Sequence, residues 1–179
     1  MKPIALFVLT ATVAITLAQE PRDSISKPKP RAPATVDLAT PVSQAEARAV
    51  FARASTVMKP VLGRNFGTPS IPSATKPVTR GQVILELGRM FDAAKPAFKF
   101  TPVKVKYDPK RLTLTNPAQK TQAMRLIEFG AAAKLGPLVA GNRDSLTIKE
   151  FGDAVGFFIA RMAELTHMPS RKWTPGLQP

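Results

Sequence analysis

Apolar residues recur at intervals of three and four positions in several segments of the chain, which is the spacing of one face of an α-helix. In the first such segment, Ser43 and Glu46 have the spacing of a capping box. Because proline disrupts the interior of a helix, the pattern predicts a helix that begins at Ser43 and stops before Pro60. Its apolar face consists of Ala47, Val50, Phe51, Ala54 and Val57.

Two later segments open with the same start signal. Thr79–Gln82 and Thr147–Glu150 both combine a capping threonine with an amide or carboxylate three residues on. The helices that follow should end near Ala94 and Thr166. Their apolar faces consist of Val83, Ile84, Leu87, Met90 and Phe91 in the first, and of Phe151, Ala154, Val155, Phe158, Ile159 and Met162 in the second.

A further helix is predicted between these two. Asn116 provides a cap and Pro117 occupies the first helical position, where proline is favoured. We expect this helix to continue through the alanine run to Ala133 and to close at Gly136-Pro137. The pattern of the whole chain thus contains four helical segments.

Residues 97–115 follow a different pattern, in which apolar side chains alternate with lysines. Such alternation indicates half-buried strands, and Asp108-Pro109-Lys110 has the composition of a turn between two of them. Pro102 favours an edge position, because proline lacks a backbone donor. The segment predicts either a short hairpin or a meandering extended connection.

The order of features suggests an internal repeat. Residues 59–65 align with residues 136–142, and Val78–Gln82 aligns with Leu146–Glu150. Self-similarity of this type indicates stacked units that share a core. We therefore predict a mainly α fold of two packed helix–loop–helix units, with the candidate hairpin inserted between them. The predicted boundaries are a helical domain at 41–168 (unit one 41–95, the insertion 96–115, unit two 116–168) and an irregular tail at 169–179.

The start of the chain has the features of a secretory signal peptide. Lys2 precedes an apolar run from Ile4 to Leu17, which is short for a membrane-spanning helix. Small residues place the expected cleavage after Ala18, and an uncleaved membrane anchor is the alternative. Residues 19–40 are rich in proline and lysine and predict a disordered linker. We expect export to the cell envelope or the extracellular space, the periplasm included, and no second membrane span.

The charge of the chain favours anionic partners. The formal net charge is +14, or +13 once Lys2 leaves with the signal peptide. Wall polymers, lipopolysaccharide and membrane surfaces are the partners that such a balance suggests for an exported protein. Specific nucleic-acid binding is not expected, because a single Tyr and a single Trp offer little stacking surface.

The sequence shows no catalytic constellation. The chain has no cysteine, and His167 is its only histidine, so nucleophile–histidine pairs and metal clusters are not expected. Nearby carboxylates such as Asp144 and Asp153 are better explained by surface salt bridges. We therefore expect a protein that is not an enzyme and uses no cofactor, with a cryptic envelope hydrolase as a remote alternative.

The Thr-capped segments resemble the S-layer homology domain of bacterial envelope proteins. Members of that family open a helix with Ile-Thr-Arg-Ala-Glu, and Val78–Gln82 keeps the apolar residue, Thr and Arg of this signature. Leu146–Phe151 keeps the apolar residue, Thr and Glu. The resemblance covers residues 41–166. The family usually arranges three copies around a pseudo-threefold axis, and two are recognised here.

This resemblance implies that grooves between the units hold negatively charged, often pyruvylated, cell-wall polysaccharides. The physical basis is that free backbone N–H groups at a helix start, together with a guanidinium, form an anion site. The alternative for the threonines, Gln82 and Glu150 is that they are helix caps alone. The predicted ligand-binding residues are Thr79, Arg80, Asn65, Thr147, Lys149, Glu150 and Asn142.

The leading hypothesis is therefore an exported envelope protein that binds an anionic cell-wall or surface polysaccharide noncovalently. The alternative is a structural or interaction module that packs against another envelope protein and has no glycan site.

Overall fold

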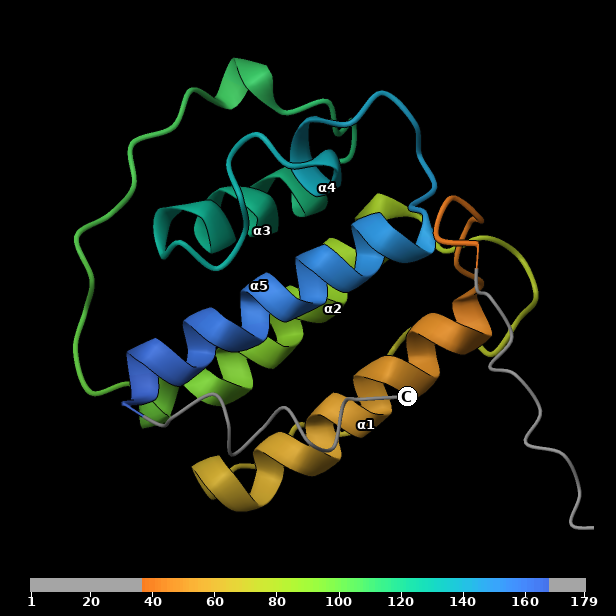
Figure 1. Cartoon of the computed structure of the whole chain (residues 1–179). Coiled ribbons are helices and arrows are strands. Elements are labelled where there is room, and N and C mark those ends of the chain that lie inside the picture. Colours follow the sequence, from red (N-terminus) through yellow and green to blue (C-terminus); the bar gives the residue numbers. More distant parts are fainter. Residues whose placement is uncertain (1–36, 168–179) are drawn as a thin grey trace, which may run out of the picture. The chain divides into compact units, whose positions relative to one another are not determined.

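The computed structural model describes residues 37–167 (Figure 1). The predicted signal peptide with its cleavage position at Ala18, most of the linker at 19–40 and the tail at 169–179 lie outside the described residues.

The described part of the chain is mainly helical, as the sequence predicts, and its backbone forms no sheet. Three isolated β-bridges are its only extended pairing. The elements are α1 (Gln44–Leu62), α2 (Arg80–Ala94), α3 (Pro117–Glu128), α4 (Pro137–Ala140) and α5 (Ile148–Thr166), with short 3₁₀ turns at Lys95–Ala97 and Pro109–Arg111.

The predicted starts of the long helices are confirmed. Thr147 and Glu150 form a reciprocal capping box, in which the Thr147 N–H donates to the Glu150 carboxylate at 2.9 Å. The Glu150 N–H donates in turn to the Thr147 hydroxyl at 3.2 Å. The same box opens α1 at Ser43 and α2 at Thr79. The predicted ends of α2 at Ala94 and of α5 at Thr166 are also confirmed.

The prediction that the first helix stops before Pro60 is wrong. Helix α1 continues to Leu62, and Pro60 lies inside its last turn. A proline there removes one backbone hydrogen bond, which the packing of the preceding turns outweighs. The helix ends instead at Gly63, whose φ of 62° is the left-handed conformation of a helix C-cap.

The prediction that the third helix runs to Ala133 is also wrong. Helix α3 ends at Glu128, and Gly130 follows with a φ of 67°. The chain then turns back, so that the N–H groups of Ala131 and Ala132 both donate to the Leu126 carbonyl, at 2.7 and 3.2 Å. The alanines are buried in this turn, because their small side chains let it lie close to the core.

The candidate hairpin does not form, and the meandering connection is observed. Residues 98–116, here called the strap, run extended around the outside of α3 (Figure 1). The strap is held by single contacts: the Val105 N–H donates to the Glu128 carbonyl at 2.9 Å, and the Thr113 N–H donates to the Val139 carbonyl at 3.2 Å. The alternation still sets its faces, because Lys104 is exposed while Val105 packs on the core.

Helix α2 is the centre of the fold. Ten of its fifteen residues are buried, and it contacts α3, α4 and α5. Helices α2 and α5 run side by side, with α1 on one side of the pair and α3 and α4 on the other (Figure 1). The rings of Phe51 and Phe151 meet edge to face at 5.5 Å and join α1 to α5. Within residues 37–167, none of the helices combines the length and the apolar character that spanning a bilayer requires.

The segments that precede α1, α2 and α5 meet in a cyclic arrangement, here called the hub. It consists of Pro41–Ser43, Pro77–Thr79 and Ser145–Thr147. The first residue of each segment bridges the third residue of the preceding one, and the cycle closes from the first segment to the last, in the pairs Pro41–Thr147, Ser43–Pro77 and Thr79–Ser145. The middle residues Val42, Val78 and Leu146 are buried at the centre.

Hydrogen bonds of the first helical residues follow the same cycle. The N–H groups of Gln44, Arg80 and Ile148 each donate to a carbonyl just ahead of a neighbouring segment, on Lys76, Asp144 and Thr40 at 2.8, 2.8 and 2.9 Å. The three helix starts are therefore pseudo-equivalent. Helix α1 is the counterpart of α2 and α5, not of α3 as the two-unit prediction has it.

The other half of the predicted repeat has no structural counterpart. In residues 59–65, Pro60 lies in the last turn of α1, whereas in residues 136–142, Pro137 begins α4.

Candidate functional site

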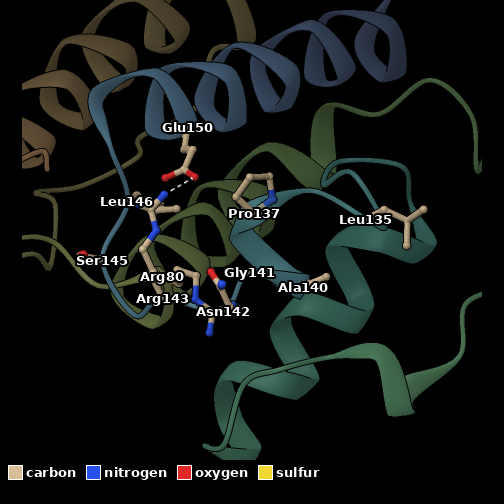
Figure 2. Close-up of a pocket in the computed structure, with 10 residues that line it drawn as sticks. All are labelled: Arg80, Leu135, Pro137, Ala140, Gly141, Asn142, Arg143, Ser145, Leu146 and Glu150. Atoms are coloured by element: carbon tan, nitrogen blue, oxygen red, sulfur yellow. Dashed lines mark hydrogen bonds and ion pairs between the residues drawn. The ribbon is translucent and has the colours of Figure 1, made fainter. Parts of the chain in front are cut away.

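A pocket of about 400 Å³ lies where the start of α2, helix α4 and the loop before α5 meet (Figure 2). The hub brings these elements together, because the Arg80 N–H donates a hydrogen bond to the Asp144 carbonyl at 2.8 Å. The residues that line the pocket include Arg80, Leu135, Pro137, Asn142, Arg143 and Glu150.

Arg80 is the most unusual of these residues. Its side chain is buried, with the whole residue 6% exposed, although it carries a charge. One guanidinium nitrogen, Nη1, donates to the Thr113 hydroxyl at 2.8 Å, and that hydroxyl donates to the Gly141 carbonyl at 2.5 Å. The strap thereby holds the guanidinium in place at the pocket.

The charge of Arg80 is not compensated within the described residues. No carboxylate of residues 37–167 lies within ion-pair distance of its guanidinium, and its Nε has no hydrogen-bond partner there. A buried charge without a partner costs several kcal/mol of stability. An anion in the pocket would remove this cost, and a guanidinium is well suited to bind carboxylate oxygens.

Arg143 and Glu150 form an ion pair at the pocket (Figure 2). Arg143 Nη2 lies 2.7 Å from Glu150 Oε1. The hydrogen bond from the Thr147 backbone, opposed by burial and assisted by the Thr147 hydroxyl and the Arg143 charge, lowers the pKa of Glu150. Glu150 is therefore ionised at neutral pH and balances Arg143, so that Arg80 gives the pocket a net positive charge.

Three predicted ligand residues, Arg80, Asn142 and Glu150, meet in this pocket. The two threonines lie beside it and act as caps, with their hydroxyls bonded to the backbone of Gln82 and Glu150.

The remaining two predicted residues lie elsewhere. Asn65 is exposed in the loop after α1, where its side-chain oxygen accepts from the Gly67 N–H at 3.1 Å. Lys149 is exposed and pairs with Asp153 at 2.7 Å. Neither lines the pocket, because the loops around Asn65 and Asn142 are not equivalent and position 149 faces the outside of α5.

The side chains that pair with Glu150 and Arg80, those of Arg143 and Thr113, are not among the sequence candidates. Arg143 follows the predicted Asn142 directly, and a basic side chain beside that loop was the available signal. Thr113 comes from the strap, 33 residues after its partner Arg80. No local pattern predicts this contact, because it depends on how the strap crosses the fold.

A second, more apolar hollow of about 170 Å³ adjoins the first and shares Pro137 and Glu150 with it. Ala133, Ala154 and the half-exposed ring of Phe157 form much of its wall. In residues 37–167, no three carboxylate or histidine side chains gather as metal ligands would.

The chain was compared with known proteins. No protein-family model matches it, and neither curated proteins nor solved structures give a significant match.

Proposed function

We propose that this chain is an exported, non-enzymatic protein of the cell envelope that binds an anionic cell-wall or surface polysaccharide in the Arg80 pocket. The observation that carries the proposal is the buried guanidinium of Arg80, which has no carboxylate partner within residues 37–167. A carboxylate of the polymer would supply that partner at the start of α2, where the helix dipole also favours negative charge.

The adjoining hollow supports a sugar polymer over a small free anion. A ligand that spans both hollows would place an acidic group near Arg80 and the apolar face of a sugar ring near Phe157. Asn142 offers an amide that can donate and accept hydrogen bonds with hydroxyl groups between them.

The hub supports the resemblance to the S-layer homology family. Three capped helix starts in a cyclic arrangement agree with the pseudo-threefold that the resemblance implies. Only one of the three pseudo-equivalent positions carries a cation. Gln44 occupies the second and lies 3.4 Å from the Gln82 side chain, and Ile148 occupies the third. The site is therefore single.

Sedimentation with purified cell wall tests the proposal, with the wall used before and after removal of its anionic polymer. Arg80→Gln should weaken binding to intact wall at least about tenfold, because a hydrogen bond to a charged group contributes about 1.5–3 kcal/mol. Arg53→Gln is the control, since Arg53 is an exposed cation of α1 that does not line the pocket. Wild-type binding should disappear with the polymer.

Two results would contradict the site. One is equal binding by Arg80→Gln and Arg53→Gln, both checked for helicity by circular dichroism. The other is equal binding by Arg143→Gln and wild type, which covers the case in which the Arg80 variant does not fold. Wall binding that survives removal of the polymer would favour an interaction module that packs on another envelope protein.

A further inference from the structure

A second basic surface lies at the opposite end of α2 from Arg80. Residues 95–104, which follow α2, carry three lysines and no acidic residue, a net charge of +3. Within residues 37–167, only Lys104 among these cations is paired, with Glu128 at 2.9 Å. Because α2 has 15 residues, this surface and the Arg80 pocket are about 22 Å apart along the helix.

The same surface exposes apolar side chains. Val103 is 94% exposed and Phe100 is 41% exposed, whereas Val105 and Tyr107 further along the strap pack against the core. A scattered exposed apolar residue is ordinary, but Phe100 follows Lys99 directly and lines a hollow of about 450 Å³, and Val103 lies three residues further along the same segment. That hollow is lined by Lys95, Phe98, Lys99, Phe100, Thr101 and Phe129.

The backbone holds this surface in place from both sides. The Lys99 N–H donates to the Leu165 carbonyl at 2.8 Å, and the Val105 N–H donates to the Glu128 carbonyl at 2.9 Å. Between these anchors, Pro102 restricts the chain, and the Phe100 ring lies 5.3 Å from the ring of His167. The segment is therefore preformed, and little conformational entropy is lost when it binds.

We propose that residues 95–104 form a peripheral membrane contact that docks on an anionic phospholipid surface. Phe100 and Val103 enter the headgroup region, and the unpaired Lys95 and Lys99 lie at the lipid phosphates. Lysines around a few inserted apolar side chains are the chemistry of reversible binding to anionic bilayers. A wall polymer would match the charge, but it would leave Val103 in water.

A fluorescent label tests this placement directly. The chain has no cysteine, so Val103→Cys gives one labelling site for an environment-sensitive dye. With the chain from Gln19 onward and phosphatidylglycerol vesicles, we expect stronger, blue-shifted emission from position 103. The control is Lys59→Cys, an exposed position in α1. Vesicle binding without a change at position 103, or with an equal change at both positions, overturns the proposal.

Substitutions test the two components separately. Val103→Asp should weaken binding to phosphatidylglycerol vesicles, measured by sedimentation, about tenfold. The double variant Lys95→Gln with Lys99→Gln should weaken it by a similar factor, and its binding should depend less on salt than that of wild type. The matched controls are Leu38→Asp, also exposed, and Lys59→Gln with Lys76→Gln. Neither control should change binding.

Three outcomes of the vesicle experiments overturn the proposal. They are equal binding to neutral phosphatidylcholine vesicles, equal loss in the matched controls, and binding to purified wall with none to vesicles. The Arg80→Gln variant should bind vesicles like wild type, so this proposal and the glycan site fail independently.

Discussion

Two charged side chains of α2 are buried, and their surroundings differ. Glu86 is fully buried, and its carboxylate accepts hydrogen bonds from the Ser70 N–H at 2.9 Å, the Ser70 hydroxyl at 2.7 Å and Arg89 Nε at 3.0 Å. Arg80, two turns earlier, has one hydrogen bond, to Thr113. A buried charge with all of its hydrogen bonds costs the fold much less than one that is nearly unbonded, so the burial of Arg80 is the costly one of the two.

Glu86 should make the stability depend on pH. Burial raises its pKa, but the bonds from Arg89 and Ser70 outweigh burial, so its pKa in the fold lies below the usual 4.5. A lowered pKa contributes stability above about pH 4.5 that is lost as the pH falls through the lowered value.

Comparison with Glu86→Gln isolates this contribution. At pH 7 the free energy of unfolding of the variant should be about 2 kcal/mol lower than that of wild type, because an amide cannot accept all of the hydrogen bonds that the carboxylate accepts. This difference in the free energy of unfolding should become smaller below pH 4.5, as the Glu86 carboxylate of wild type gains a proton. Urea unfolding from pH 7 to pH 3 measures both curves, and a gap that does not depend on pH would contradict the assignment.

At the scale of elements, helix starts were predictable and helix ends were less so. A cap is a local pattern, in which Ser43 with Glu46 or Thr147 with Glu150 satisfies the first N–H groups. Where a helix ends depends on the balance between its packing on the core and the conformations that proline and glycine favour. Pro60 predicts a stop, but α1 accommodates it in its last turn and ends at Gly63. The alanine run predicts helix, but the chain turns at Gly130 before it.

The strap shows a second limit at this scale. Its alternation of lysines and apolar residues correctly gives an outer and an inner face, as Lys104 and Val105 show. Strand pairing was not predictable from it, because a ladder needs a partner, and the inner face packs on helices instead. The hydrogen bond from Arg80 to Thr113 is likewise not predictable from a local pattern, because it depends on which part of the fold the strap packs against.

Two glycines test the account of helix ends. Gly63 has a φ of 62° and open space around its Cβ position, so Gly63→Ala changes only backbone strain and should cost about 1 kcal/mol. Gly152 lies inside α5 and also has open space, so Gly152→Ala should stabilise by roughly 0.5–1 kcal/mol. Thermal unfolding should shift in opposite directions, and a shift in the same direction would contradict the cap.

At the scale of the whole molecule, the sequence indicates that helix starts are repeated, but it shows only two of the three equivalent starts. Val78–Gln82 and Leu146–Glu150 were recognised as equivalent. Pro41–Glu46 shows the same spacing, Pro-Val-Ser with a carboxylate three residues after the serine, but the two-unit prediction makes it the start of the first helix of a pair. The equivalence becomes evident only when the hub pairs Ser43 with Pro77 and Pro41 with Thr147.

The hub also predicts how many ligands bind. Because Arg80 is the one cation among its pseudo-equivalent positions, a short fragment of the anionic polymer should bind with a stoichiometry of one. Titration calorimetry measures this number, with Arg80→Gln as the control that should bind the fragment at least about tenfold more weakly. Two or more equal sites in wild type, or undiminished binding by Arg80→Gln, would place the ligand elsewhere.

The cyclic pairing has a consequence for folding. Each closure of the hub joins backbone groups that are distant in the chain, and Pro41 meets Thr147 almost at the other end of the described domain. Contacts of such sequence separation form late, because the entropy of closing the intervening chain must be overcome first. The cycle cannot close while its last member is missing. A nascent chain that lacks α5 would therefore hold α1 and α2 without their common centre, and the domain becomes native only when its final helix is available.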